Sequence, residues 1–151
     1  MKLWQKDKVS LKEVEKFTVG NDRDLDIYLA PFDVLGSLAH TQMLESIGLL
    51  TKDELTLLKA ELKNIYQLTT KPDFKLEEGV EDIHSQVELM LTQKLGDIGK
   101  KIHSARSRND QVLVDLKLFL RSEIEQLVNE VIQFFELLIK QSDQYKDVLM
   151  P

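Results

Sequence analysis

Apolar residues recur every three or four positions along much of the chain, and this spacing predicts helices. A helix is expected from Ala30-Pro31 to about Gly48, because proline suits the first helical turn and glycine suits the residue after the last turn. Its apolar face is expected to carry Leu35, Leu38, Ala39 and Met43. A shorter helix is expected earlier, around Leu11, Val14 and Phe17, followed by a break at Gly20-Asn21-Asp22.

Two further helices are indicated by their first residues. Thr51 and Glu54 form a capping box, in which each side chain satisfies a free backbone N–H of the other residue. The helix that follows is expected to end before Lys71-Pro72-Asp73 and to bury Leu55, Leu58, Leu62 and Ile65. Another helix is expected over residues 82–95, with Ile83, Val87 and either Met90 or Leu91 inside, and residues 96–109 are expected to form a loop.

The last segment, from about 110 to 146, contains neither glycine nor proline. Two apolar stripes run along it, one through Leu113, Leu116, Leu120, Ile124, Leu127, Val131, Phe134 and Leu138, the other through Val112, Phe119, Val128, Ile132, Phe135 and Ile139. A single helix of this length spans roughly 55 Å at about 1.5 Å per residue, which exceeds the diameter of a compact domain of this size, roughly 40 Å. We therefore expect its partners to come from later sequence or from other subunits.

These patterns predict an all-α protein with two parts. Residues 1–108 are expected to form an N-terminal helical domain, and residues 109–151 to begin a central bundle of long helices. The composition agrees, because three prolines and six glycines among 151 residues leave few turns for a β-sandwich or barrel.

Composition also narrows the function. The net charge of −6 argues against general nucleic-acid binding, which usually leaves a basic footprint. The lack of cysteine excludes disulfides and thiol chemistry. The chain begins without the apolar run of a signal peptide, and no window approaches the roughly 20 apolar residues of a membrane span. We therefore expect a cytoplasmic protein without membrane partners.

One loop carries an unusual density of positive charge for an acidic chain. Between Asp97 and Asp110 there are four cationic side chains, one histidine and no acid. Ser107, Arg108 and Asn109 directly precede the long helix, where free N–H groups and the helix dipole favour an anion. An arginine there can hold a carboxylate through two parallel hydrogen bonds. The alternative is that Asn109 or Asp110 merely caps the helix while the cations are solvated.

Other candidates are weaker when judged by spacing alone. Asp82 is most simply a helix cap, and His84, two residues later, is most often a packed or surface histidine. Two such residues are too few for a metal site, and no zinc, phosphate-loop or dinucleotide motif occurs. No metal or cofactor is therefore expected. The acids Asp22, Asp24 and Asp26 are either solvated or recognise a cationic group, and His40 has no evident partner.

The run from His103 to Val112, which includes R-S-R-N-D-Q, resembles the first signature of the argininosuccinate lyases, usually H-T-G-R-S-R-N-D-Q-V. The similarity extends to Asp115-Leu116-Lys117-Leu118, Glu81-Asp82-Ile83-His84, Gly99-Lys100-Lys101-Ile102-His103 and Asp33-Val34-Leu35-Gly36-Ser37, in the same order. The resemblance implies an all-α fold like that of aspartase and fumarase and a homotetramer whose active sites combine three subunits. It also implies cofactor-free cleavage of argininosuccinate to arginine and fumarate, a step of arginine biosynthesis.

Residue roles follow from the resemblance position by position. Ser107, Arg108 and Asn109 would bind the substrate, the last two near its succinyl carboxylates. Asp82 and His84 would line the same pocket, His84 through a hydrogen-bonded network, and Asp26 would contact the arginine end. The sequence departs from the pattern at Ala105, usually glycine, at Asp22, often serine, and at Leu3-Trp4-Gln5, where the family has L-W-G-G-R-F.

The family's catalytic histidine and serine lie in later segments, G-Y-T-H-L-Q and S-S-x-M-P-x-K-x-N-P, that do not occur here. We therefore expect these 151 residues to be the N-terminal portion of a lyase, to contain no catalytic residue and to be inactive alone. Three alternatives remain: another lyase of the superfamily, such as adenylosuccinate lyase; a non-catalytic helical association module; and RNA binding through the cationic loop.

Overall fold

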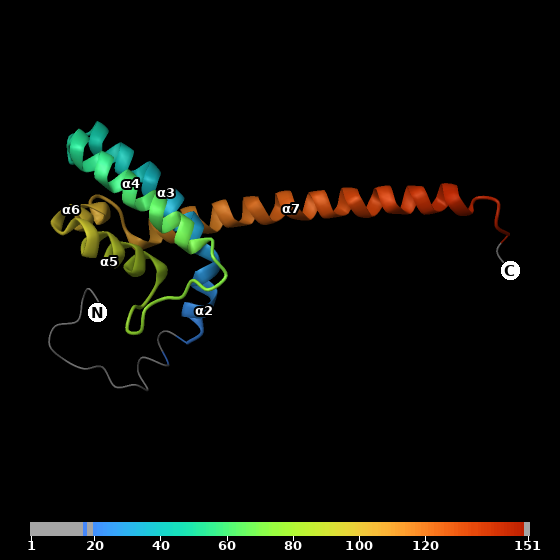
Figure 1. The fold of residues 1–151 in the computed structure, drawn as a ribbon, viewed down its shortest axis with the longest axis horizontal. Coiled ribbons are helices and arrows are strands. Elements are labelled where there is room, and N and C mark those ends of the chain that lie inside the picture. The colour runs from blue at the N-terminus through green and yellow to red at the C-terminus, as the bar shows by residue number, and fades with distance from the viewer. Residues whose placement is uncertain (1–16, 18–19, 150–151) are drawn as a thin grey trace. The chain divides into compact units, whose positions relative to one another are not determined.

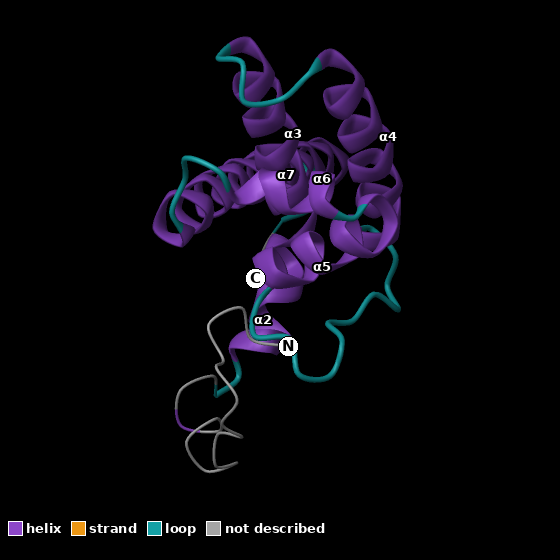
Figure 2. Ribbon diagram, turned by 90° about the vertical axis from the view of Figure 1, so that its left-hand side faces the viewer, coloured by secondary structure: helices purple, strands orange, loops and turns teal. Residues whose placement is uncertain are grey.

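The computed structural model describes residue 17 and residues 20–149, and within these ranges it contains helices and no strand (Figure 2). The all-α prediction is thereby confirmed for the described residues. The chain divides into two units, Met1–Leu116 and Lys117–Pro151. The short helix expected around Leu11 and Val14 lies outside the described residues. The predicted domain boundary at residues 108 and 109 stays a prediction.

The first helices of unit 1 follow one another almost without interruption. The break predicted at Gly20 is present as a turn with φ of +52°. It leads into α2 (Asp22–Asp26), the 3-10 helix η1 (Ile27–Leu29) and α3 (Ala30–Ser46). The start of α3 is confirmed, with Pro31 in its first turn, and Gly48 follows its end with φ of +79°. The sequence analysis did not anticipate α2, which carries Asp26 at its last position.

The predicted apolar face of α3 is wrong at Leu35, Ala39 and Met43, which are exposed, although Leu38 is partly buried against the core. Leu35 is 40% exposed and Met43 37% exposed, whereas the buried positions are Ala30, Asp33, Val34, Ser37, Thr41 and Leu44. The error arises because half of this buried face is polar. A hydrophobic pattern cannot identify a face on which Asp33, Ser37 and Thr41 are buried through contacts with other parts of the chain.

The next two helices agree closely with the sequence pattern. Helix α4 (Lys52–Thr69) begins with the predicted capping box, in which Glu54 N–H donates to Thr51 Oγ1 at 3.2 Å and Thr51 N–H donates to Glu54 Oε2 at 2.9 Å. Helix α5 (Ile83–Leu95) begins after Asp82 and buries Leu91 rather than Met90. Helices α3 and α4 pack side by side, and α5 packs on both (Figure 1). Their shared core consists of Ala30, Val34, Leu44, Leu50, Leu58, Leu62, Ile65, Ile83, Val87, Leu91 and Ile102.

The segment expected to be a loop is partly helical. It contains α6 (Asp97–Lys100) and the 3-10 helix η2 (Lys101–His103). Helix α6 lies directly on α5, because Gly99 is buried and presents no side chain to the α5 backbone. Only the few residues from Ser104 to Ser107 remain as a connection to the long helix. The predicted loop was wrong because a tight helix contact, rather than local propensity, orders this segment.

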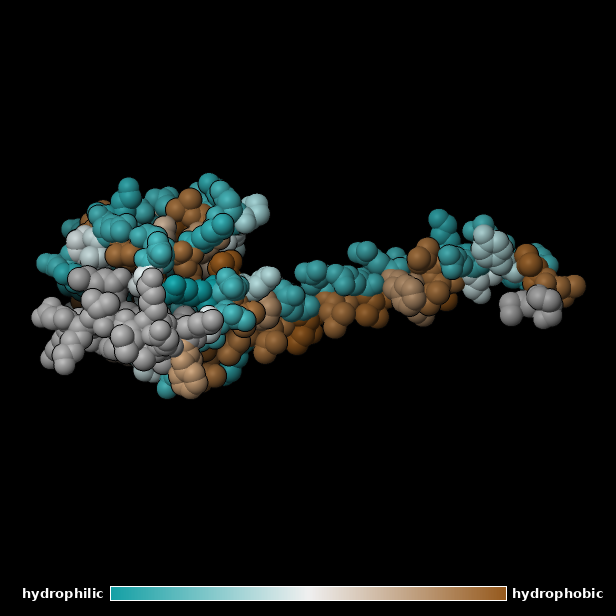
Figure 3. All heavy atoms as spheres, turned by 90° about the horizontal axis from the view of Figure 1, so that it is seen from below, coloured by the Kyte–Doolittle hydropathy of each residue, from teal (hydrophilic) through white to brown (hydrophobic). Residues whose placement is uncertain are grey.

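The long helix is confirmed as α7 (Arg108–Tyr145). In unit 1 its first turns bury Gln111 and Asp115. In unit 2 its residues from 120 onward are exposed, including Leu120, Ile124, Leu127, Val128, Val131, Ile132, Phe134, Phe135, Leu138 and Ile139. Apolar and hydrophilic side chains gather on opposite sides of this unit in Figure 3. No helix among the described residues is long and apolar enough to span a membrane.

Candidate functional site

A cleft of about 360 Å³ in unit 1 brings together residues from α2, the N-terminus of α5 and the first turns of α7. It is lined by Asp22, Leu25, Asp26, Glu81, Asp82, His84, Arg108 and Val112. Four of the six residues predicted to bind substrate, namely Asp26, Asp82, His84 and Arg108, therefore share one cleft. Ser107 and Asn109 flank Arg108 in the sequence but do not line it. The cleft is rich in carboxylates, and Arg108 is its one arginine among the described lining residues.

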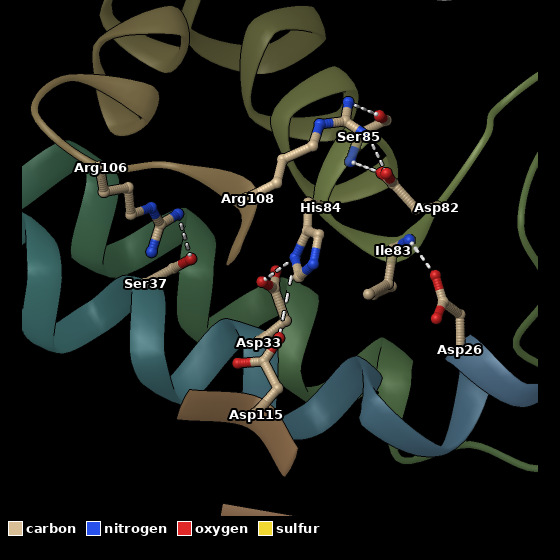
Figure 4. A network of polar contacts seen from close by, with 10 residues as sticks. All are labelled: Asp26, Asp33, Ser37, Asp82, Ile83, His84, Ser85, Arg106, Arg108 and Asp115. Carbon is tan, nitrogen blue, oxygen red and sulfur yellow. Dashed lines mark hydrogen bonds and ion pairs between the residues drawn. The ribbon is translucent and has the colours of Figure 1, made fainter. Parts of the chain in front are cut away.

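Asp82 has two roles at the start of α5. Its Oδ1 accepts a hydrogen bond from the backbone N–H of Ser85 at 2.8 Å, so it is the N-cap that its position suggested. Its Oδ2 forms an ion pair with Nη1 of Arg108. The second terminal nitrogen of Arg108, Nη2, donates to Ser85 Oγ at 2.8 Å (Figure 4). The arginine predicted to hold a substrate carboxylate is thus paired with a carboxylate of its own protein.

The start of α7 is also internally satisfied. Ser107, rather than Asn109 or Asp110, precedes the first helical residue, and its Oγ accepts from Asp110 N–H at 3.3 Å. Asp110 Oδ2 in turn accepts from the N–H and Oγ of Ser107 at 2.9 and 2.8 Å. The expected capping by Asn109 or Asp110 was therefore placed two or three residues too late. Asn109 is exposed.

Asp26 joins the end of α2 to the start of α5. Its Oδ2 accepts from the backbone N–H of Ile83 at 3.1 Å, which satisfies one of the free donors of that helix. Burial raises the pKa of Asp26, and the Ile83 hydrogen bond and the nearby His84 act against this rise. The carboxylate predicted to meet the arginine end of the substrate is therefore anchored in the cleft wall.

His84 lies between two buried acids at the inner end of the cleft. Its Nδ1 is 2.6 Å from Asp33 Oδ1 and 3.7 Å from Asp115 Oδ2 (Figure 4). Asp33 and Asp115 are each 1% exposed and come from α3 and α7. The network predicted for His84 thus has named partners. In the sequence, Asp33 stands out only as the first residue of the motif Asp33-Val34-Leu35-Gly36-Ser37.

The contacts and burial of this cluster shift the pKa values of His84 and Asp115. Burial alone lowers the pKa of His84, but the hydrogen bond to Asp33 and the charges of Asp33, Asp115 and Asp26 together raise it above its usual value. Burial, reinforced by the charge of Asp33, raises the pKa of Asp115 to about 7. Both shifts favour retention of a proton by His84 or Asp115 near neutral pH, and Asp33 Oδ1 is the acceptor atom nearest to Nδ1 of His84.

The cations of the predicted anion-binding segment all have protein partners. Lys100 Nζ lies 2.7 Å from Asp97 Oδ1, and Lys101 Nζ lies 2.5 Å from Glu54 Oε1. Arg106 Nη2 donates to Ser37 Oγ at 3.0 Å, and burial lowers the pKa of Arg106. The contacts of Lys101 and Arg106 fix the segment to α4 and α3, whereas the Lys100 pair lies within α6.

The backbone conformation at residue 105 accounts for the glycine that is usual there in the family signature. Ala105, where glycine is usual, has φ of +59°, in the left-handed region that glycine adopts without penalty. The preceding carbonyl, that of Ser104, accepts a hydrogen bond from Nε2 of His40 at 2.8 Å. His40 therefore has a structural partner that the sequence did not reveal. It holds the turn in which Ala105 lies.

A metal ion is a weak interpretation of the buried cluster. Asp33, His84 and Asp115 offer ligand atoms within 4.8 Å of one another. However, Nδ1 of His84 and Oδ1 of Asp33 are 2.6 Å apart, which is a hydrogen-bond distance and leaves no room for an ion between them. The geometry fits a hydrogen-bonded charge cluster.

Sequence reasoning missed Asp33, Ser85 and Asp115 as members of the site. A usable signal existed for Asp115, since it follows Arg108 and Gln111 at helical spacing on one polar face of an amphipathic helix. Ser85 is three residues after Asp82, at the position whose backbone N–H donates to a capping side chain. Asp33 gave no signal beyond its position in the quoted motif.

A cleft that gathers ionisable side chains from several helices has the chemistry suited to a small charged molecule. A family model described as "Lyase" matches residues 4–151, so the chain belongs to this lyase family.

Three similar proteins are called argininosuccinate lyase. Those of Phocaeicola vulgatus, Parabacteroides distasonis and Bacteroides fragilis are 65%, 64% and 63% identical over 150 residues. The aligned region is 99% of this chain and 34% of each relative. The chain therefore spans about a third of the length of these relatives.

Proposed function

We propose that the complete protein containing this chain is an argininosuccinate lyase of arginine biosynthesis, which cleaves argininosuccinate to arginine and fumarate. The observation that carries the proposal is the identity of 63–65% with argininosuccinate lyases over 99% of the chain. This level of identity favours argininosuccinate over adenylosuccinate as the substrate.

The cleft supports complementary roles for its charged residues. Arg108 presents Nη1 and Nη2 to two acceptors, Asp82 and Ser85, and the same planar group suits a substrate carboxylate. Ser107 and Asn109, which flank Arg108 outside the cleft lining, are proposed to complete the substrate contact in the complete protein. Asp26 supplies negative charge for the guanidinium end of the substrate, and Asp82 lines the same cleft.

The reaction needs a fixed set of donors around the succinyl group. Removal of a proton beside a carboxylate leaves extra negative charge, which fixed donors stabilise before the C–N bond breaks. In this proposal the residues of this chain bind and orient the substrate, and later parts of the complete protein remove the proton.

The test is fumarate formation, followed by ultraviolet absorbance, with the complete protein and either argininosuccinate or adenylosuccinate. We expect turnover of argininosuccinate alone. The variant Asp73→Asn, which removes an exposed carboxylate outside the cleft, is the matched control and should retain activity. Turnover of adenylosuccinate instead would assign a different lyase, and turnover of neither would favour a helical association module.

We further propose that the 151 residues alone do not turn over argininosuccinate, because the family's histidine and serine segments are absent from them. The same absorbance assay on the purified 151-residue chain tests this. Fumarate release at a rate comparable with that of the complete protein would contradict it.

The complete protein is proposed to be a cytoplasmic homotetramer with a central bundle of the aspartase and fumarase type. The exposed apolar side chains of α7 in unit 2 support this, because contiguous apolar surface of this kind usually marks an interface. Light scattering on the purified protein should give four times the mass of one subunit. A monomer would contradict the proposed assembly.

A further inference from the structure

Two buried acids, Asp33 and Asp115, lie beside the His84 ring, which lines the cleft. Asp33 and Asp115 reach Nδ1 from α3 and α7, while His84 itself belongs to α5. Three helices thus meet at one edge of the imidazole ring. The ring is held by Nδ1, so its orientation is set by partners that do not line the cleft.

The opposite edge of the ring faces the cleft. His84 lines the cleft with Asp26 and Arg108, and Nε2 lies on the side of Asp26 in Figure 4. Among the described residues, every hydrogen bond of the His84 ring uses Nδ1. Nε2 is therefore the nitrogen that remains for a ligand.

When both acids are ionised, the charge balance of the cluster favours a protonated ring. Asp33 and Asp115 are buried carboxylates, and one oxygen of each, Oδ2, has no hydrogen-bond partner among the described residues. Leaving both acids ionised with one neighbouring cation would bury an uncompensated charge, which is costly. Arg106 supplies one positive charge, and a protonated His84 supplies the second.

We propose that Asp33 and Asp115 are positioning residues that keep His84 as an imidazolium, with Nε2–H directed into the cleft as a donor to an anionic group of the ligand. His84 and Arg108 then form a pair of cationic anchors for a dicarboxylate. The identity of this ligand as the succinyl end of argininosuccinate rests on the proposed function. The charge state of His84 does not.

The charged groups around the ring determine its pH dependence. They come from every helix that packs on it: Asp26 on α2, Asp33 on α3, Asp82 and Glu88 on α5, Arg106 before α7, and Arg108 and Asp115 on α7. The two acids in direct contact with Nδ1 act in the same direction and favour the protonated ring. Asp33, at 2.6 Å, should act more strongly than Asp115, at 3.7 Å.

The direct test is the pKa of His84 in the complete protein, measured from the slow deuterium exchange of its ring C–H by mass spectrometry. We expect a pKa above the usual 6.5 in the wild type. It should fall by at least about one unit in Asp33→Asn and by less in Asp115→Asn. The control Asp73→Asn should leave it unchanged.

Kinetics separate positioning from mere support of the fold. If the proposal holds, Asp33→Asn should lower kcat/KM for argininosuccinate by at least about tenfold at pH 8 and by much less at pH 6, where solvent protonates His84 again. An equal loss at both pH values would indicate a structural role and overturn the proposal. If Asp33→Asn does not fold, the wild-type pKa and Asp115→Asn decide the question.

The two proposals fail in different ways. A wild-type pKa of His84 at or below 6.5, or one unmoved by both substitutions, would overturn the positioning role even in an active argininosuccinate lyase. Raised and substitution-sensitive values in a protein that does not cleave argininosuccinate would overturn the proposed function and leave the charge state of His84 standing.

Discussion

The contact between α6 and α5 can be tested by a single methyl group. In Gly99→Ala, the new Cβ would lie 2.5 Å from the carbonyl carbon of Leu91, 2.6 Å from the nitrogen of Thr92 and 2.7 Å from the carbonyl oxygen of Leu91. All three atoms belong to the α5 backbone, so no side-chain rotation relieves the clash. Either α6 moves away or α5 distorts.

The cost follows from the energetics of overpacking. Forcing a methyl group into a well-packed contact costs about 1–3 kcal/mol, and a rigid backbone neighbour places Gly99→Ala at the upper end. Alanine recovers up to about 1 kcal/mol because it favours the helix more than glycine does. We therefore expect a net loss of about 2 kcal/mol. The displacement would also move the Ser104–Ser107 connection, which α6 and η2 precede.

Hydrogen–deuterium exchange of the peptide covering α5 measures this loss locally, without assuming that the complete protein unfolds in one step. A loss of about 2 kcal/mol should speed its slowest amides by roughly 30-fold. Gly36→Ala is the matched control. Its new Cβ would approach Val114 Cγ1 at 3.3 Å, a side chain that can turn.

The two glycine variants should thus change the exchange rate of α5 in opposite directions, or at least by different amounts. Gly36→Ala should be neutral or slightly protective because helix propensity improves within α3. Unchanged exchange of α5 in Gly99→Ala, or equal damage from both variants, would refute the argument that backbone contact makes Gly99 irreplaceable.

Three further predictions concern the cleft and its surroundings. Arg108→Lys keeps the charge but loses the planar group that reaches both Asp82 and Ser85. The complete enzyme should therefore lose about 1–3 kcal/mol of transition-state stabilisation, measured from kcat/KM. Wild-type kinetics would exclude a carboxylate clamp. Ala105→Gly should raise the thermal midpoint slightly, because relief of about 1 kcal/mol of left-handed strain exceeds the added chain entropy; a lower midpoint would contradict the strain. The pKa of Asp115 is raised from 3.8 to about 7 by folding, so its contribution to stability is fully present below pH 4 and is lost as the pH rises through about 7. The urea midpoint should therefore fall between pH 5 and pH 8, and less steeply in Asp115→Asn; equal slopes would mean that Asp115 is not the titrating group.

Local sequence signals were sufficient for most helix boundaries. Pro31, the Thr51 and Glu54 box and the Asp82 cap act within one turn of the residues they satisfy, so their spacing along the chain is already their spacing in the structure. The length of α7 could also be predicted, because residues 110–146 contain no glycine or proline that would interrupt a helix. The cleft residues Asp26, Asp82, His84 and Arg108 could be nominated from the motifs of a known family.

What the sequence could not supply is which buried polar groups meet. Asp33, His84 and Asp115 stand on three different helices, and their contact exists only because α3, α5 and α7 cross at that point. The same crossing made the apolar pattern of α3 misleading, since the face turned inward is the one with Asp33 and Ser37 rather than Leu35. A buried charge is costly unless an opposite charge lies beside it, and here that opposite charge belongs to another helix. The order of residues along the chain shows neither which counter-charge lies beside a buried acid nor how close it is. Only the tertiary structure decides this pairing.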